Sequence, residues 1–250
     1  MRFVIFLVLS SFLGTLVNAQ PSSARKRLFD DNWYFHRGDV PDGENPSLNT
    51  GGWRTVDLPH DWSIEDIPGT GSPFDPEAVS GVSGGFTVGG IGWYRKHFTL
   101  SPSQKNKRIY IEFEGVYRNA TVWINGDSLG THPYGYTSFY YDITDKVKFT
   151  GNNVLAVRVK NEGRNSRWYT GSGIYRHVWL TAAEPLHVAQ WGSFITTPEA
   201  TAASARVNVK TTVMNSGGKK ASARLLTVIR DPWGKAVATL QSKEAIRAGG

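Results

Sequence analysis

The most restrictive feature of this 250-residue sequence is its succession of short alternating segments separated by turn residues. Residues 108–114 and 154–160 each place apolar side chains at every second position. Asn125-Gly126, a dipeptide that strongly favours a two-residue hairpin, follows the apolar segment 120–124. Apolar residues do not recur at helical spacing over three turns. The pattern therefore predicts an all-β protein built as a jelly-roll β-sandwich.

A change in composition near residues 183–185 divides the predicted strands into two groups. Residues 25–183 are dense in aromatic residues and glycine, and we expect them to form the jelly-roll domain. The plainer alternation after residue 186, with turns at 215–218 and 231–234, is typical of an immunoglobulin-like sandwich. Such a domain needs about 100 residues. Residues 186–250 are therefore expected to be the start of a truncated immunoglobulin-like domain, so that the sequence ends within a domain.

The first 19 residues have the features of an export signal. A short basic start precedes the apolar run 3–13, and Val17-Asn18-Ala19 supplies the small-x-small pattern of a cleavage site. The alternative is a membrane anchor, but the apolar run is too short to span a bilayer. We therefore expect a secreted or periplasmic protein whose mature chain begins at Gln20 and does not associate with a membrane.

Composition excludes several classes of function. The sequence contains no cysteine, which rules out disulfides, cysteine nucleophiles and thiolate zinc sites. The formal net charge is +7, but the basic residues are spread among acidic ones, which favours a solvated surface over a nucleic-acid interface. The six histidines lack compact ligand spacing. We expect no metal, no other cofactor and no nucleic-acid partner.

Two patterns resemble catalytic motifs but are better explained otherwise. Residues 81–85 fit G-x-S-x-G, yet no helix is predicted after them, as a nucleophile elbow requires. Glu112 and Glu114 are paired carboxylates on one face of a predicted strand. Their side chains would project in parallel, about 6.6 Å apart, with no room for a sugar between them. We interpret the first pattern as a loop and the second as a solvated strand face.

A series of less generic segments carries the functional signal. Taken in order, LPHDW at 58–62, VWING at 122–126, GYTSF at 135–139, DIT at 142–144 and WYTGSGIYR at 168–176 resemble the sugar-binding domain of glycoside hydrolase family 2. That family includes β-galactosidases, β-glucuronidases and β-mannosidases. The resemblance covers about residues 27–180. The LPHDW segment and the WYTGSGIYR loop are most similar to the β-galactosidase-type members.

The resemblance implies a jelly-roll domain, an immunoglobulin-like domain and then a TIM barrel. In the family the barrel carries an acid/base glutamate and a nucleophilic glutamate, which act by the retaining route. Neither barrel motif occurs in this sequence. No catalytic residue can therefore be assigned, and this region alone is expected to be inactive without the C-terminal barrel of the same protein.

The family also implies that loops of the N-terminal domain help to form the pocket for the terminal sugar. The matching residues are Arg167, Trp168 and Asp61. A guanidinium offers several donors to adjacent hydroxyls, and an indole offers a flat face. The alternative is that Trp168 and Asp61 only brace the loops. Gly89-Gly90 stands where some family members have an asparagine that contacts substrate.

The sequence thus predicts the pocket-contributing part of a secreted retaining glycosidase that acts on terminal β-galactosides. Two other classes stay open: a stand-alone carbohydrate-binding module without catalysis, and a structural adhesion domain. A carbohydrate partner is predicted for both the glycosidase and the carbohydrate-binding module. The sequence is compatible with a homo-oligomer and does not specify the glycosidic linkage.

Overall fold

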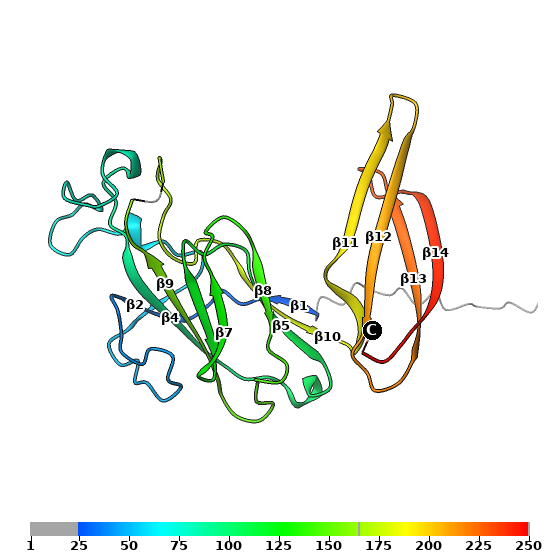
Figure 1. The fold of residues 1–250 in the computed structure, drawn as a ribbon, viewed down its shortest axis with the longest axis horizontal. Coiled ribbons are helices and arrows are strands. Elements are labelled where there is room, and N and C mark those ends of the chain that lie inside the picture. Colours follow the sequence, from blue (N-terminus) through cyan, green and yellow to red (C-terminus); the bar gives the residue numbers. More distant parts are fainter. Residues whose placement is uncertain (1–24, 165, 250) are drawn as a thin grey trace, which may run out of the picture.

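The computed structural model describes residues 25–164 and 166–249, in which every strand pairing is antiparallel (Figure 1). Besides strands, this part of the chain contains only single turns of 3-10 helix, at Trp62–Ile64, Val82–Gly84 and Pro102–Gln104. The prediction of an all-β protein is confirmed. The predicted export signal lies outside the described residues.

Two sheets form the larger, sandwich-like unit. The six-stranded sheet has the order β3-β2-β4-β9-β6-β7, and the four-stranded sheet has the order β1-β10-β5-β8. The strands of the first sheet are β2 (Trp33–Arg37), β3 (Arg54–Val56), β4 (Gly90–Phe98), β6 (Ala120–Ile124), β7 (Asp127–His132) and β9 (Asn153–Asn161). Those of the second are β1 (Lys26–Leu28), β5 (Arg108–Phe113), β8 (Phe139–Asp142) and β10 (Val178–Ala183).

The core lies between these sheets and follows from the alternation of the strands. Ile109, Ile111 and Phe113 on β5 are fully buried, as the two-residue period of that segment requires. Trp33 and Trp62 add the largest buried apolar surfaces of the cluster. Burial of apolar area on this scale is the main force that stabilises a fold without disulfides.

The predicted hairpin at Asn125-Gly126 is present. The two residues have φ angles of 53° and 90°, and Ile124 on β6 pairs with Asp127 on β7. Positive φ at both central positions is the geometry that asparagine and glycine tolerate best. The predicted loop at 81–85 is also present: Ser83 lies in a single 3-10 turn, and no α-helix follows it within the described residues.

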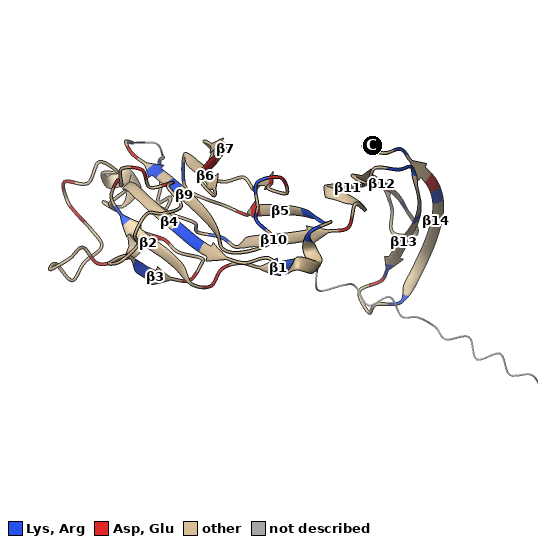
Figure 2. Cartoon of the chain, turned by 90° about the horizontal axis from the view of Figure 1, so that it is seen from below, with Lys and Arg blue, Asp and Glu red and all other residues tan. Residues whose placement is uncertain are grey.

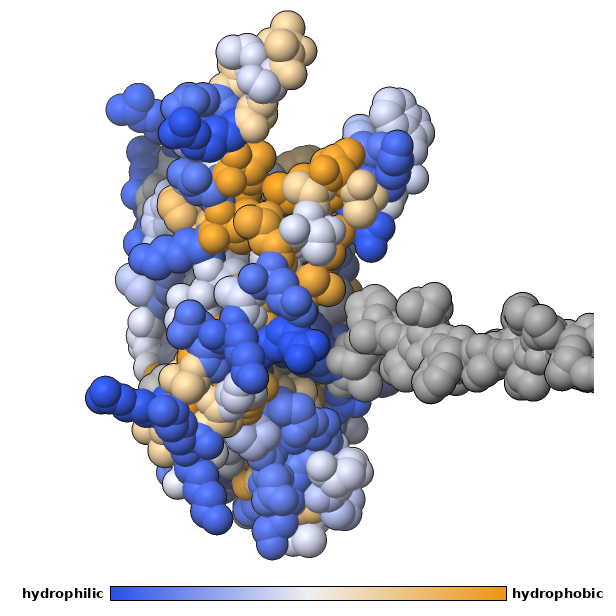
Figure 3. Space-filling view, turned by 90° about the vertical axis from the view of Figure 1, so that its right-hand side faces the viewer, coloured by the Kyte–Doolittle hydropathy of each residue, from blue (hydrophilic) through white to orange (hydrophobic). Residues whose placement is uncertain are grey.

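Beyond residue 185 the chain forms two hairpins. Strand β11 (Leu186–Ala200) pairs with β12 (Ala205–Asn215), and β13 (Ala221–Arg230) pairs with β14 (Ala236–Ile246). Several apolar side chains of these small sheets are exposed, among them Phe194, Ile195 and Leu226. Figure 3 shows apolar residues gathered on the face at this end of the molecule.

Contacts at the junction of the two units correct one prediction. The solvated strand face predicted around Glu112 is wrong, because β11 covers this part of β5. The Glu112 side chain is only 7% exposed and accepts hydrogen bonds from Lys26 Nζ (2.9 Å), Gln190 Nε2 (2.6 Å) and Trp191 Nε1 (3.2 Å). A buried carboxylate of this kind is tolerated only when it is paired and hydrogen-bonded, as Glu112 is.

Charged residues of both signs occur on both units of the described chain. Figure 2 shows lysine and arginine interspersed with aspartate and glutamate on the strands and loops. This distribution agrees with the solvated surface inferred from the sequence. No helix in the described part of the chain is long and apolar enough to cross a membrane.

Candidate functional site

Two of the segments singled out by sequence, LPHDW and WYTGSGIYR, meet at one end of the six-stranded sheet. The β9–β10 connection, residues 162–177, carries WYTGSGIYR, and the LPHDW segment runs directly against it. The backbone amide of His60 donates to the carbonyl of Ile174 at 2.8 Å, and that of Trp62 donates to the carbonyl of Ser172 at 3.0 Å. The two segments, about 110 residues apart in sequence, therefore form one structural unit.

Asp61 fastens this unit through both carboxylate oxygens. Oδ1 accepts from the backbone amides of Ser63 (2.9 Å) and Ser172 (2.7 Å), and Oδ2 accepts from the Tyr169 hydroxyl. Burial raises the pKa of Tyr169, and the adjacent Asp61 carboxylate reinforces the shift. Gly171 has a φ of 71°, and a Cβ there would lie 2.5 Å from Asp61 Oδ2, so the close approach requires glycine.

A second connection runs inward from the same unit. The backbone amide of Ile174 hydrogen-bonds the Tyr94 hydroxyl, which lies 2.6 Å from His60 Nδ1. His60 Nε2 lies 2.9 Å from Glu65 Oε1. Since the Glu65 carboxylate only accepts, Nε2 carries the proton and Nδ1 accepts from Tyr94. Arg54 Nη2 donates to both oxygens of Glu65, at 2.7 and 2.8 Å.

Burial governs the protonation states in this chain of hydrogen bonds. It raises the pKa of Tyr94 well above its ordinary value. It lowers the pKa of His60, and the neighbouring Glu65 offsets only part of that effect. Burial alone would raise the pKa of Glu65, but the hydrogen bonds from Arg54 and His60 outweigh it and lower the pKa. A neutral His60 and a charged Glu65 thus hold the Tyr94 hydroxyl in place against Ile174 of the loop.

A third connection joins the unit to Gly89, the residue that precedes β4, and to the end of β9. Trp62 Nε1 donates to the Gly89 carbonyl at 3.1 Å. The hydroxyls of Ser63 and Ser172 hydrogen-bond at 2.7 Å, and Asn161 Nδ2 donates to Ser172 Oγ at 2.7 Å. These bonds join the loop to the adjacent ends of β9 and β4, where Asn161 pairs with Gly90.

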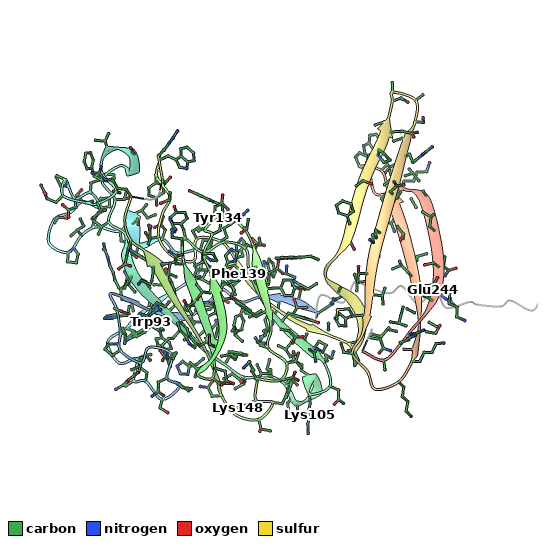
Figure 4. All side chains as sticks on the ribbon, in the orientation of Figure 1. Trp93, Lys105, Tyr134, Phe139, Lys148 and Glu244 are labelled. Atoms are coloured by element: carbon green, nitrogen blue, oxygen red, sulfur yellow. The ribbon has the colours of Figure 1, made fainter. Side chains whose placement is uncertain are left out.

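A cavity of about 370 Å³ opens beside this unit, between the β9–β10 connection and residues 75–90. Its wall includes Asp75, Glu77, Asn161, Arg164, Trp168 and Thr170. Trp168 is 63% exposed, so much of its indole face is available to a ligand. Arg164 Nε donates to the Val79 carbonyl at 3.1 Å and thereby bridges the two sides. Figure 4 shows the side chains that project from these loops.

The three residues named from sequence take different positions. Trp168 lines the cavity. Asp61 does not line the cavity; it accepts a hydrogen bond from the hydroxyl of Tyr169, the residue after Trp168. Arg167 is exposed but is absent from the described cavity wall. Gly89 and Gly90, where some family members have an asparagine, do line the cavity.

Sequence reasoning missed the supporting residues and part of the wall. His60 and Tyr94 are separated by 34 residues, so no local pattern links them. The cavity residues Asp75, Glu77 and Arg164 stand in loops without a periodic signal. Among the described residues no group of histidine and acidic side chains could hold a metal ion. Glu112 lies on β5 of the other sheet and Glu114 directly follows that strand, where its Oε1 accepts from Trp179 Nε1 at 2.7 Å.

The wall combines a flat indole with several polar side chains, which is the chemistry that binds a sugar ring and its hydroxyls. Comparison with known proteins is consistent with this chemistry. Residues 92–181 match the family model described as the glycosyl hydrolase 2 galactose-binding domain-like region. Residues 92–181 of this chain belong to the galactose-binding-like domain of glycoside hydrolase family 2. The resemblance inferred from the sequence motifs is thus confirmed.

Relatives of this family 2 domain are longer proteins. A β-galactosidase of Bacteroides ovatus is 43% identical over 95% of this chain and 27% of its own length. A putative β-glucuronidase of Formosa agariphila is 40% identical over 87% of this chain and 20% of its own length. A solved family 2 member from Bacteroides cellulosilyticus is 51% identical, with a TM-score of 0.83, over 89% of this chain and 29% of that chain.

The chain therefore spans between a fifth and a third of the length of these relatives. The names of the relatives include both β-galactosidase and β-glucuronidase. These relatives therefore differ in the sugar that their names state. Galactose and glucuronic acid differ in charge, so the charged residues that line the cavity bear on which sugar this chain binds.

Proposed function

We propose that the complete protein is a retaining glycoside hydrolase that removes terminal β-galactose, and that this domain supplies one wall of the pocket for that sugar. The observation that carries the proposal is the exposed Trp168 in the wall of a cavity bordered by the WYTGSGIYR loop. The catalytic carboxyl groups would come from the barrel of the complete protein, because neither glutamate motif occurs in this chain.

The charge of the cavity wall favours galactoside over glucuronide. Among the described residues of the wall, Asp75 and Glu77 are accompanied by one cation, Arg164, and Glu162 is paired with Lys160 at 3.2 Å. Leaving aside Arg167 outside it, the wall thus has a net negative charge, which disfavours the carboxylate of glucuronic acid. A galactose ring is neutral and meets no such repulsion. The β-glucuronide is the second candidate because relatives of both names match.

Turnover by the complete protein tests the choice of sugar. We expect kcat/KM for 4-nitrophenyl β-galactoside to exceed that for the β-glucuronide by at least about tenfold. The β-mannoside serves as a third substrate. A preference for the glucuronide or the mannoside would overturn the substrate assignment and leave the family unchanged.

Arg167 is proposed as a second sugar contact, reached from the rim of the cavity when the barrel is in place. The Arg167→Ala variant is expected to raise KM for the galactoside by about tenfold, because a hydrogen bond from a charged donor is lost. A variant with unchanged kcat and KM would remove Arg167 from the pocket.

We also propose that the protein acts outside the cytoplasm. The support is the apolar run 3–13 followed by Val17-Asn18-Ala19. Mass spectrometry of the protein from its natural source should find Gln20, or its cyclised form, at the N-terminus. A mature protein that retains Met1 would contradict the proposal.

A further inference from the structure

The β7–β8 connection, residues 133–138, presents two tyrosine rings that the cavity does not use. Tyr134 is 57% exposed and Tyr136 is 43% exposed. Their ring centroids are 5.6 Å apart with an interplanar angle of 71°, so the pair presents both a ring face and a ring edge. Figure 4 shows Tyr134 at the edge of the sandwich from which the β9–β10 connection also projects. We call Tyr134 and Tyr136 the tyrosine platform.

The tyrosine platform is held rigidly. The Tyr136 ring packs on the buried ring of Tyr117, with centroids 5.3 Å apart. Gly135 lies so close to Tyr117 that a Cβ at this position would overlap the ring. The Ser138 hydroxyl donates to the Glu114 carbonyl at 3.0 Å. A surface fixed in this way loses little conformational entropy when a ligand binds.

Direct hydrogen bonds join the platform to the loop that borders the cavity. The Tyr175 hydroxyl donates to the Gly135 carbonyl at 2.8 Å. Tyr117 and Gly173 exchange two backbone hydrogen bonds of 2.9 Å each. The Tyr117 hydroxyl also hydrogen-bonds Thr170, which lines the cavity. The platform is therefore continuous with the cavity wall, and its distance from the cavity is set by these bonds.

The chemistry of the platform matches the second part of a glycan. A phenol offers a flat apolar face for the C–H groups of a pyranose ring and a hydroxyl that can donate or accept at its rim. We propose that Tyr134 and Tyr136 bind the sugar units that follow the terminal residue held in the cavity. The natural substrate is then an extended oligosaccharide. This inference rests on the proposed function, since it assigns the remainder of the substrate of the same site.

The test compares a long and a short substrate in the complete protein. The double variant Tyr134→Ala/Tyr136→Ala is assayed with a galactose-terminated tetrasaccharide and with 4-nitrophenyl β-galactoside. We expect the ratio of kcat/KM for the tetrasaccharide to that for the 4-nitrophenyl substrate to fall about tenfold or more. The Tyr134→Phe/Tyr136→Phe variant keeps both rings and should keep this ratio within about threefold.

The control is Trp233→Ala, which removes an aromatic side chain that is 89% exposed on the distant β13–β14 turn. It should leave the ratio unchanged. If the double variant does not fold, as judged by circular dichroism, Tyr134→Ala alone carries the test, because Tyr134 is the more exposed ring.

An unchanged ratio in the double variant would overturn the proposal. This includes an equal loss of kcat/KM on both substrates, which would mean that the tyrosines pack against another part of the protein. Failure of the wild-type protein to hydrolyse either substrate would instead refute the proposed function. In that case calorimetry with the tetrasaccharide decides the platform. Binding that weakens about tenfold in the double variant supports it, and absence of wild-type binding refutes it.

Discussion

At the scale of single residues, the site depends on polar side chains that connect segments far apart in sequence. Asp61 uses both oxygens to hold Ser63, which follows it two residues later, and the loop 169–172. His60 hydrogen-bonds both Glu65, which is paired with Arg54, and Tyr94. Tyr94 in turn hydrogen-bonds the backbone of Ile174 in the loop. These side chains position the WYTGSGIYR segment, of which Trp168 and Thr170 line the cavity.

Acidification should weaken the fold through His60. Burial lowers the pKa of His60 in the folded protein, so the unfolded chain binds a proton first as the pH falls below about 6.5. The stability contributed by the neutral imidazole is present above that pH and is lost as the pH falls toward the folded value. The lowered pKa of Glu65 acts in the same direction at lower pH, below its ordinary value.

The variant His60→Gln separates this effect from other acid effects. A glutamine amide can donate to Glu65 and accept from Tyr94, but it does not titrate. We expect the thermal midpoint of the variant to fall less between pH 7.5 and pH 5 than that of the wild type. His36→Gln, outside the network, is the matched control. Equal falls in the His60 variant and the wild type would show that His60 does not titrate with folding.

At the scale of elements, the WYTGSGIYR loop is shaped by glycines as well as by its partners. The Gly171→Ala variant should destabilise the protein by about 2 kcal/mol, because an alanine would adopt a positive φ and collide with Asp61. Gly69→Ala is the matched control: Gly69 also has a positive φ, but a Cβ there meets no atom within 4 Å.

Thermal unfolding of the two glycine variants measures the difference. The control carries only the backbone strain, so its loss should be about 1 kcal/mol. If both variants lost the same stability, the close packing of Gly171 against Asp61 would contribute nothing. A larger loss in the control would contradict the account of the loop.

The junction between the sandwich and the β11–β12 hairpin depends on Glu112. We propose that the boundary between the two units lies between residues 183 and 186. Glu112→Gln removes the carboxylate that accepts hydrogen bonds from Lys26, Gln190 and Trp191. The free energy of unfolding should fall by about 1–3 kcal/mol, and proteolysis near this boundary should become faster. Glu184→Gln is the control: this residue is paired with Lys107 but is largely exposed, so its loss should stay below about 1 kcal/mol.

Chemical denaturation and limited chymotrypsin digestion, which can cleave near the boundary at Leu186 and Trp191, measure the two effects. An unchanged cleavage rate in Glu112→Gln would mean that the buried carboxylate does not hold the junction. A loss in the control as large as that in Glu112→Gln would point to a general effect of charge.

At the scale of the whole molecule, the alternation of residues such as Ile109, Ile111 and Phe113 predicted the sandwich, because one face of each strand must be buried. Asn125-Gly126 predicted its hairpin from backbone geometry alone. The sequence could not reveal the burial of Glu112, because a later hairpin covers it. Nor could it reveal the pairing of His60 with Tyr94, which exists only after two distant segments have packed.

The same distinction applies to the candidate site. The motif series identified Trp168 and Asp61, but their separate roles follow from three-dimensional contacts: one lines the cavity and the other fastens the loop. Asp75, Glu77 and Arg164 determine the charge of the wall and come from loops without a sequence signature. Loops are where sequence patterns carry the least information about position.

The central claim is that this domain forms one wall of the sugar pocket, and Trp168→Ala in the complete protein tests it most directly. We expect kcat/KM for 4-nitrophenyl β-galactoside to fall about tenfold or more, with a thermal midpoint close to that of the wild type, because the indole is exposed. Trp233→Ala, which removes a distant exposed indole, should stay within about twofold. A Trp168→Ala variant that also stays within twofold would contradict the claim.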